Sequence, residues 1–96
     1  HPSSVRFGSI EEDARRRDFT INAMYVEPES GAIIDLVGGR RDIEARVVRA
    51  VGNADDRFRE DRLRMLRAIR FAARLDFEIE ASTFEAIRLE AATITD

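Results

Sequence analysis

The sequence predicts an α+β fold, in which a strand-rich first half is followed by helices. Two observations lead to this prediction. Apolar residues that alternate or run together mark three short strands within the first half of the chain. In the second half, apolar residues recur every three or four positions, as they do on one face of a helix. The prediction places a boundary near residue 55, so that residues 1–54 and residues 55–96 form two parts.

The first half is expected to open with an irregular or extended stretch and a short helix. Ser9 is the predicted N-cap of this helix, because three acidic residues follow it in what would be the first turn. Strands are predicted in FTINAMYVE, AIIDLV and VVRAVG, with PESG as the turn between the first two. GGRRDIEAR is predicted to form a glycine-led loop and a short helix. DLVGG by itself is a weak signal, because it lacks the longer glycine pattern of a phosphate-binding loop.

The second half is predicted to hold one long helix that ends near Leu75 and a shorter helix after it. Three residues are candidates for the N-cap of the long helix: Asn53, Asp55 and Asp56. LDFEIEAS is expected to link the two helices, with Phe77 and Ile79 pointing inward. Ser82 is the predicted N-cap of the last helix, since Glu85 follows three residues later in a capping-box arrangement.

Length and composition bound the possible classes. Ninety-six residues make one small domain or part of a larger one, and 44% hydrophobic residues suffice for a modest core. No apolar run approaches the roughly 20 residues of a membrane span. The absence of cysteine excludes disulfides and thiolate metal sites and fits a cytoplasmic protein. The net charge of −3 argues against a generally basic nucleic-acid binder.

The distribution of charge is more informative than its sum. All sixteen basic residues are arginine, and residues 57–74 hold seven of them against Glu60 and Asp61. On a helical projection, one face carries Arg64, Arg67, Arg70 and Arg74. The opposite stripe carries Phe58, Met65, Leu66, Ile69, Ala72 and Ala73. The apolar stripe is expected to dock on the core. The arginine face is then either a solvated surface with scattered ion pairs or a binding site for an anion.

Asp61 and Arg64 suggest what such an anion would be. They lie three residues apart and are expected to be side by side on the helix. A carboxylate accepts from an exocyclic amine, and arginine donates to base acceptors. Together they are able to read the Watson–Crick edge of cytosine or adenine, while the other arginines hold a triphosphate or an RNA strand.

A second arginine group lies in ARRRDFTINA, at a predicted junction between a helix and a strand. Such a junction is able to hold a phosphate, although arginines at the end of a helix also simply complement its dipole. Asp18 is expected to organise this corner rather than to bind a ligand. Asn22 is a candidate for a hydrogen bond that holds the backbone.

Two motifs together identify a family. RRDFTINA at residues 16–23 and EDRLRMLRAIRF at residues 60–71, with IIDLVGG between them, resemble the class II tRNA nucleotidyltransferases and bacterial poly(A) polymerases. The resemblance runs over essentially the whole chain. It implies the second part of a nucleotidyltransferase head-domain sheet in residues 1–54, followed by the start of a helical neck in residues 55–96. One departure is that the usual Asp-Pro of the middle motif is Asp35-Leu36 here.

The resemblance also implies roles for individual residues. Members add C and A to tRNA 3′ ends, or A tails to RNA, from CTP and ATP. The nucleotide-binding residues would be Arg17, Asp61, Arg64, Arg67 and Arg70, and Arg16, Asp18 and Glu60 would support them. The family's catalytic carboxylates, which hold Mg²⁺, are expected upstream of residue 1, so no catalytic or metal-binding residue is assigned within the chain.

Two other functions remain open at this point. One is a non-catalytic module that binds nucleotides or RNA, and the other is a purely structural α+β domain with solvated arginines. The three hypotheses differ in whether binding occurs and whether turnover follows it.

Overall fold

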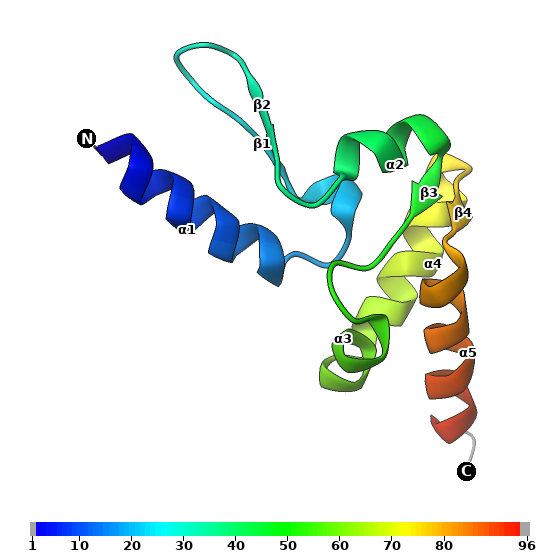
Figure 1. Cartoon of the computed structure of the whole chain (residues 1–96). Coiled ribbons are helices and arrows are strands. Elements are labelled where there is room, and N and C mark those ends of the chain that lie inside the picture. Colours follow the sequence, from blue (N-terminus) through cyan, green and yellow to red (C-terminus); the bar gives the residue numbers. More distant parts are fainter. Residues whose placement is uncertain (1, 95–96) are drawn as a thin grey trace.

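The computed structural model describes the backbone of residues 2–94 and the side chains of residues 9–93. Its elements, in order, are α1 (Pro2–Arg16), the 3₁₀ helix η1 (Thr20–Asn22), β1 (Met24–Val26), β2 (Ile33–Asp35), α2 (Gly39–Ala45), β3 (Val47–Val48), α3 (Ala54–Glu60), α4 (Leu63–Leu75), β4 (Glu78–Ile79) and α5 (Ala81–Ile94). Helices and short strands are mixed, which confirms the predicted α+β class (Figure 1).

The molecule is elongated, with extents of 53 × 26 × 17 Å. Helix α1 and the β1–β2 hairpin extend from one side of a more compact body that contains α3, α4 and α5 (Figure 1). β1 pairs with β2 in antiparallel register, with Tyr25 opposite Ile34. β3 pairs in parallel with β4, which joins the two halves of the chain. No helix within the described residues is long and apolar enough to cross a membrane.

The beginning of the chain differs from the prediction. α1 starts at Pro2, so the extended entry and the N-cap at Ser9 were both wrong. A helix interior tolerates serine and glycine at a cost of up to about 1 kcal/mol each, and here the helix continues through them. The predicted first strand is also shorter, because residues 20–22 form η1. Asn22 Oδ1 accepts a hydrogen bond from the Phe19 amide at 3.2 Å, as predicted for this residue.

The second half differs from the prediction in two places. The single long helix is divided into α3 and α4, because Asp61 has an extended backbone (φ −151°, ψ 101°). Asn53 caps α3, as one of the three predicted candidates. The predicted capping box of Ser82 and Glu85 is wrong. Instead, the Glu80 carboxylate accepts from the amides of Ser82 (2.7 Å) and Thr83 (3.0 Å) at the start of α5.

The main core lies between the helices and β3. Its buried members are Phe19, Val48, Phe58, Met65, Ala68, Ala86 and Ile87, with Phe77 and Ile79 packed against them as predicted. Three members of the predicted apolar stripe are exposed: Leu66 (49%), Ile69 (48%) and Ala73. Because these residues lie within α4 itself, the error is in the width of the stripe: α4 turns a narrower side to the core, centred on Met65, Ala68 and Ala72.

Candidate functional site

The centre of the site is the carboxylate of Asp18, which lies in the turn between α1 and η1. Its Oδ1 accepts from Arg64 Nε at 2.9 Å, and its Oδ2 accepts from Arg67 Nε at 2.5 Å. Arg67 Nη2 also donates to Oδ1, at 3.3 Å. Only 17% of the Asp18 side chain is exposed, so solvent screens these pairs less than it would at a free surface. Asp18 therefore joins the two arginine-rich segments.

The backbone on both sides of Asp18 is fixed to the segment that follows β3. The Val51 amide donates to the Asp18 carbonyl at 3.0 Å, and the Thr20 amide donates to the Arg49 carbonyl at 3.0 Å. Phe19, between them, is fully buried, and its ring meets that of Phe71 edge to face at 5.7 Å between centroids. Buried packing and backbone hydrogen bonds thus aim Asp18 at α4.

Asp61 lies at the junction of α3 and α4. Its Oδ1 accepts from the Leu63 amide at 3.0 Å and so satisfies the first amide of α4, whose N-cap residue is Arg62. Its Oδ2 lies 3.4 Å from Arg67 Nη2, so its ion pair is with Arg67 rather than with Arg64. The side chain remains 39% exposed and a carboxylate has about four lone-pair sites, which leaves room for a further donor.

Arg64 is held by three hydrogen bonds and is only 18% exposed. Besides Asp18, it donates through Nη1 to the Arg57 carbonyl (3.2 Å) and to Glu60 Oε1 (3.1 Å). These bonds use Nε and Nη1, so the two N–H groups of Nη2 remain available. Arg67 uses Nε and Nη2 in the same way, which leaves its Nη1 available. The hydrogen bond to Asp18 holds the pKa of Arg67 above its ordinary value.

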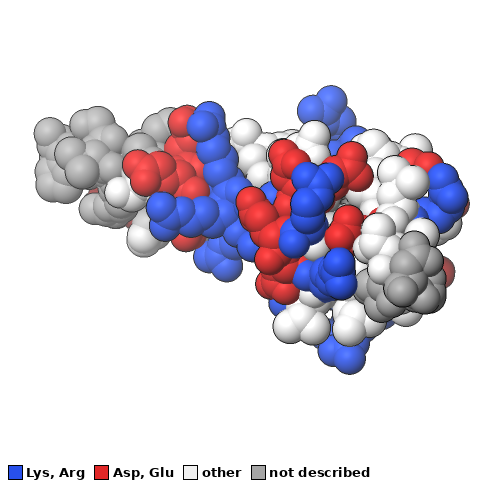
Figure 2. Space-filling model, turned by 90° about the horizontal axis from the view of Figure 1, so that it is seen from below, with Lys and Arg blue, Asp and Glu red and all other residues white. Residues whose placement is uncertain are grey.

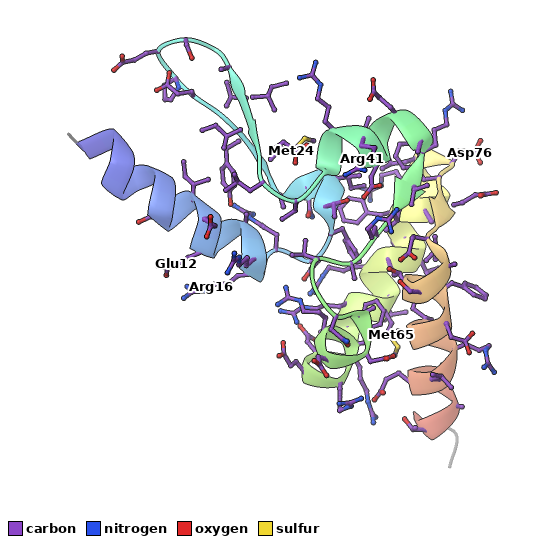
Figure 3. All side chains as sticks on the ribbon, in the orientation of Figure 1. Glu12, Arg16, Met24, Arg41, Met65 and Asp76 are labelled. Carbon is purple, nitrogen blue, oxygen red and sulfur yellow. The ribbon has the colours of Figure 1, made fainter. Side chains whose placement is uncertain are left out.

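The remaining predicted residues lie apart from this cluster. The Arg17 guanidinium pairs with Asp13 at 3.3 Å and lies over the Tyr25 ring, 5.9 Å from its centroid. Arg16 is beside Glu12 at the end of α1 (Figure 3). Arg70 lines a small hollow on α4 and has no ion pair with any described residue. Only Glu60, Asp61, Arg64, Arg67 and Asp18 are brought together, and the role of every predicted site residue stays a prediction.

The expected repulsion along the arginine face is relieved by acids at Arg64 and Arg67, but not at Arg70 and Arg74. Sequence reasoning found only Glu60 as a partner within the helix, because Asp18 lies more than forty positions away in the chain. Figure 2 shows the consequence on one face of the molecule, where arginines and acidic residues alternate rather than forming a single basic patch. No pattern in the local sequence would have revealed this pairing.

One residue of the cluster was missed altogether. Arg57, in α3, donates through Nη2 to the carbonyls of Arg16 (2.8 Å) and Arg17 (2.6 Å) at the end of α1. The only sequence signal was its membership of the arginine-rich stretch. A metal centre, in contrast, has no basis in the side chains that the structure describes, among which no three His, Cys, Asp or Glu residues gather to hold an ion.

Comparison with known proteins gives three kinds of match. A family model described as the poly A polymerase head domain matches residues 1–49. A CCA-adding enzyme from Streptococcus pyogenes serotype M3 (strain ATCC BAA-595 / MGAS315) is 56% identical over 88 residues. That alignment covers 91% of this chain and 22% of the relative, so the chain spans about a fifth of the length of the curated relatives it matches.

Solved structures match in fold and in sequence. The crystal structure of the Bacillus stearothermophilus CCA-adding enzyme in complex with CTP is 52% identical, with a TM-score of 0.78, over 81% of this chain and 20% of that one. A complex structure of a CCA-adding enzyme with ATP is 38% identical, with a TM-score of 0.82, over 92% of this chain and 21% of that one. The family model covers half of the residues, and relatives in sequence and structure agree with it. The chain therefore belongs to the poly A polymerase head-domain family.

Proposed function

We propose that the protein containing this chain is an RNA 3′-end nucleotidyltransferase, which adds C, A or both from CTP and ATP to tRNA or another RNA. This stretch supplies nucleotide recognition. The observation that carries the proposal is the cluster around Asp18, in which RRDFT and EDRLR, far apart in the sequence, share one carboxylate. Relatives that are 52% and 38% identical were solved with CTP and ATP.

Base selection would use the donors and acceptors that the cluster leaves free. Cytosine and adenine both carry an exocyclic amine next to a ring nitrogen that accepts a hydrogen bond. The half-exposed carboxylate of Asp61 would accept from the amine, and Nη2 of Arg64 would donate to the ring nitrogen. Guanine and uracil present a carbonyl in place of that amine and would meet the carboxylate unfavourably.

The phosphates or the RNA backbone would lie along α4. A hollow of about 160 Å³ is lined by Arg67, Arg70, Phe71 and Arg74. Arg70 and Arg74 form no ion pair with the described residues, so their charges are available to an anion. Arg17, half exposed near the end of α1, would add a further positive charge.

The reaction joins the RNA 3′ oxygen to the α-phosphorus of CTP or ATP, breaks the bond to the β-phosphate and releases pyrophosphate. Mg²⁺ is the metal that such chemistry uses, to neutralise charge on the phosphates. Among the described residues, no three His, Cys, Asp or Glu side chains gather to hold an ion, and the proposal gives this stretch recognition alone. Residues 1–54 would belong to the head domain, and residues 55–96 would begin the neck. With an RNA substrate, the proposed location of the protein is the cytoplasm.

The test uses the full-length protein and a tRNA that lacks its 3′ CCA. Incorporation is measured with CTP, ATP, UTP and GTP for the unmodified protein, for Asp61→Ala and for Arg64→Lys. Arg59→Ala is the matched control, because Arg59 is exposed and pairs only with Asp56 in its own helix. We expect the unmodified protein to incorporate CTP, ATP or both. We expect Asp61→Ala and Arg64→Lys to lose the preference for CTP and ATP over UTP and GTP.

Other outcomes separate the alternatives. Nucleotide or RNA binding without turnover would indicate a non-catalytic binding module. No binding of CTP, ATP or RNA would indicate a structural domain whose arginines are solvated. Turnover with unchanged base preference in both site variants would mean that Asp61 and Arg64 do not select the base.

A further inference from the structure

Arg57 connects the end of α1 with α3 and α4, which both contribute residues to the proposed site. Its Nη2 donates to the Arg16 and Arg17 carbonyls, at 2.8 and 2.6 Å. The last carbonyls of a helix have no partner within the helix, and α1 ends at Arg16. The charged guanidinium of Arg57 satisfies the last carbonyl of α1 and the carbonyl that follows it, with bonds stronger than those between neutral groups. Arg57 therefore fixes the end of α1, directly before Asp18.

The same residue also contacts the other half of the site through its backbone. The Arg57 carbonyl accepts from Arg64 Nη1 and from the Asp61 amide, both at 3.2 Å. These contacts close a ring. The side chain of Arg57 holds Arg17, the next residue Asp18 holds Arg64, and Arg64 returns to the Arg57 carbonyl. Within this ring, a shift of α1 relative to α3 moves Asp18 relative to the arginines of α4.

The environment of Arg57 indicates that it acts on the protein rather than on a ligand. Both N–H groups of Nη2 are used by carbonyls. Its Nε is buried without a hydrogen-bond partner, while the side chain as a whole is half-buried. No carboxylate in the described residues pairs with it, in contrast to its neighbour Arg59, which pairs with Asp56 at 3.4 Å. The cost of partly burying this charge is offset by the carbonyls of Arg16, at the end of α1, and of Arg17, just after it.

We infer that Arg57 is a positioning residue of the nucleotide site, which holds the Arg17–Asp18 corner so that Asp18 keeps Arg64 and Arg67 in their base-reading orientation. The inference rests on the proposed function. A lysine at this position keeps the charge but replaces the fork-shaped guanidinium with a single shorter donor group. Displacement of binding groups by about 1 Å is able to weaken their action by factors of ten or more.

The experiment compares Arg57→Lys with Arg59→Lys in the full-length protein. Dissociation constants are measured for CTP, ATP and UTP, and for cytidine, which has no phosphate. Far-UV circular dichroism and thermal melting establish that each variant is folded. We expect Arg57→Lys to weaken the binding of CTP and of cytidine by the same factor of about ten. We also expect it to reduce the preference for CTP over UTP. Arg59→Lys is expected to change none of these values.

Each contrary result overturns the inference in a different way. Weaker binding of CTP with unchanged binding of cytidine would mean that Arg57 contacts the phosphates directly. A lower melting temperature with unchanged dissociation constants and base preference would make it purely structural. If Arg57→Lys does not fold, Arg57→Gln and Arg59→Gln are compared in the same way, since glutamine still donates one hydrogen bond to a carbonyl.

The proposed function is tested separately, by the incorporation measurement on the unmodified protein described above. Binding of CTP or ATP by the unmodified protein without incorporation into RNA would contradict the transferase proposal, while the effect of Arg57 on binding would still be measured. If the unmodified protein bound neither nucleotide nor cytidine, both the proposed function and the role of Arg57 would be wrong.

Discussion

At the scale of single residues, Asp35 shows how one side chain organises a loop. Its carboxylate accepts hydrogen bonds from the amides of Gly38, Gly39 and Arg40 at 2.9 Å each, and from Val37 at 3.4 Å. Burial raises the pKa of Asp35, but these amide hydrogen bonds lower it by more. The DLVGG loop is therefore a cap for α2, which agrees with its weak signal as a phosphate site.

Gly39 is required by close approach rather than by its backbone conformation. A Cβ built on Gly39 would lie 2.1 Å from the carbonyl oxygen of Thr20 and 3.1 Å from Met24 Cγ. Because the first of these atoms is backbone, it cannot turn away. We predict that Gly39→Ala lowers the free energy of unfolding by about 3 kcal/mol, as measured by chemical denaturation. Gly31→Ala is the control, since nothing lies within 4 Å of its Cβ and only its positive φ opposes the change; equal losses in both variants would contradict this account.

Glu80 makes stability depend on pH. Burial raises its pKa, but hydrogen bonds from Ser82 and Thr83 outweigh burial and set the pKa at about 2, below its ordinary value of 4.5. Because the folded pKa is depressed, the stabilisation is complete above about pH 4.5 and is lost as the pH falls toward 2. At about 1.4 kcal/mol per pKa unit, it amounts to about 3 kcal/mol.

We therefore predict that Glu80→Gln lowers the free energy of unfolding at pH 7 by an amount on the order of 3 kcal/mol. The loss should shrink as the pH falls from 4.5 toward 2, because the carboxyl of the unmodified protein becomes protonated in that range. Urea denaturation at a series of pH values measures this. Glu78→Gln, two residues earlier on an exposed position, is the matched control. A constant difference between Glu80→Gln and the unmodified protein across the series would show that the carboxylate charge is not responsible.

At the scale of elements, local signals predicted what local contacts decide. The hairpin of β1 and β2 and the short helix α2 were correct, because turn residues and apolar alternation determine them. Three predictions were wrong: the start of α1 at Ser9, a single helix that continues through Asp61, and the capping box of Ser82 and Glu85 at α5. In the last two cases a carboxylate, that of Asp61 or Glu80, captures nearby amides and sets the helix start. The sequence shows only an acidic residue at such a position. It does not show whether the carboxylate accepts from backbone amides or faces solvent.

The N-cap of α3 is a further test at this scale. Asn53 Oδ1 accepts from the Asp56 amide at 3.0 Å. We predict that Asn53→Ala costs about 1 kcal/mol of unfolding free energy, because the amide loses its acceptor, whereas Asn53→Asp costs little. Denaturation curves of the two variants measure the difference. Losses of the same size in both variants would mean that the amide side chain contributes through something other than the cap.

At the scale of the whole molecule, the site depends on contacts between distant parts of the sequence. RRDFT and EDRLR were recognisable as motifs, and their residues follow from the sequence alone. Their arrangement does not, because Asp18 meets Arg64 and Arg67 only when the end of α1 packs against α3 and α4. The sequence therefore predicted which residues to examine, and the tertiary contacts determined which of them lie together.

The core joins the two halves in the same way and makes a prediction about cooperativity. Phe58, 1% exposed, lies after the predicted boundary near residue 55, yet it shares one cluster with Phe19 and Val48. We predict that Phe58→Ala costs about 3–5 kcal/mol and that both halves unfold in one transition. In the 96-residue polypeptide, Tyr25 is the single tyrosine and tryptophan is absent, so its fluorescence reports on the first half while circular dichroism reports on the helices. Leu66→Ala, at a half-exposed position, should cost far less. Two separate transitions in the unmodified polypeptide would mean that the halves fold independently and that the shared core does not couple them.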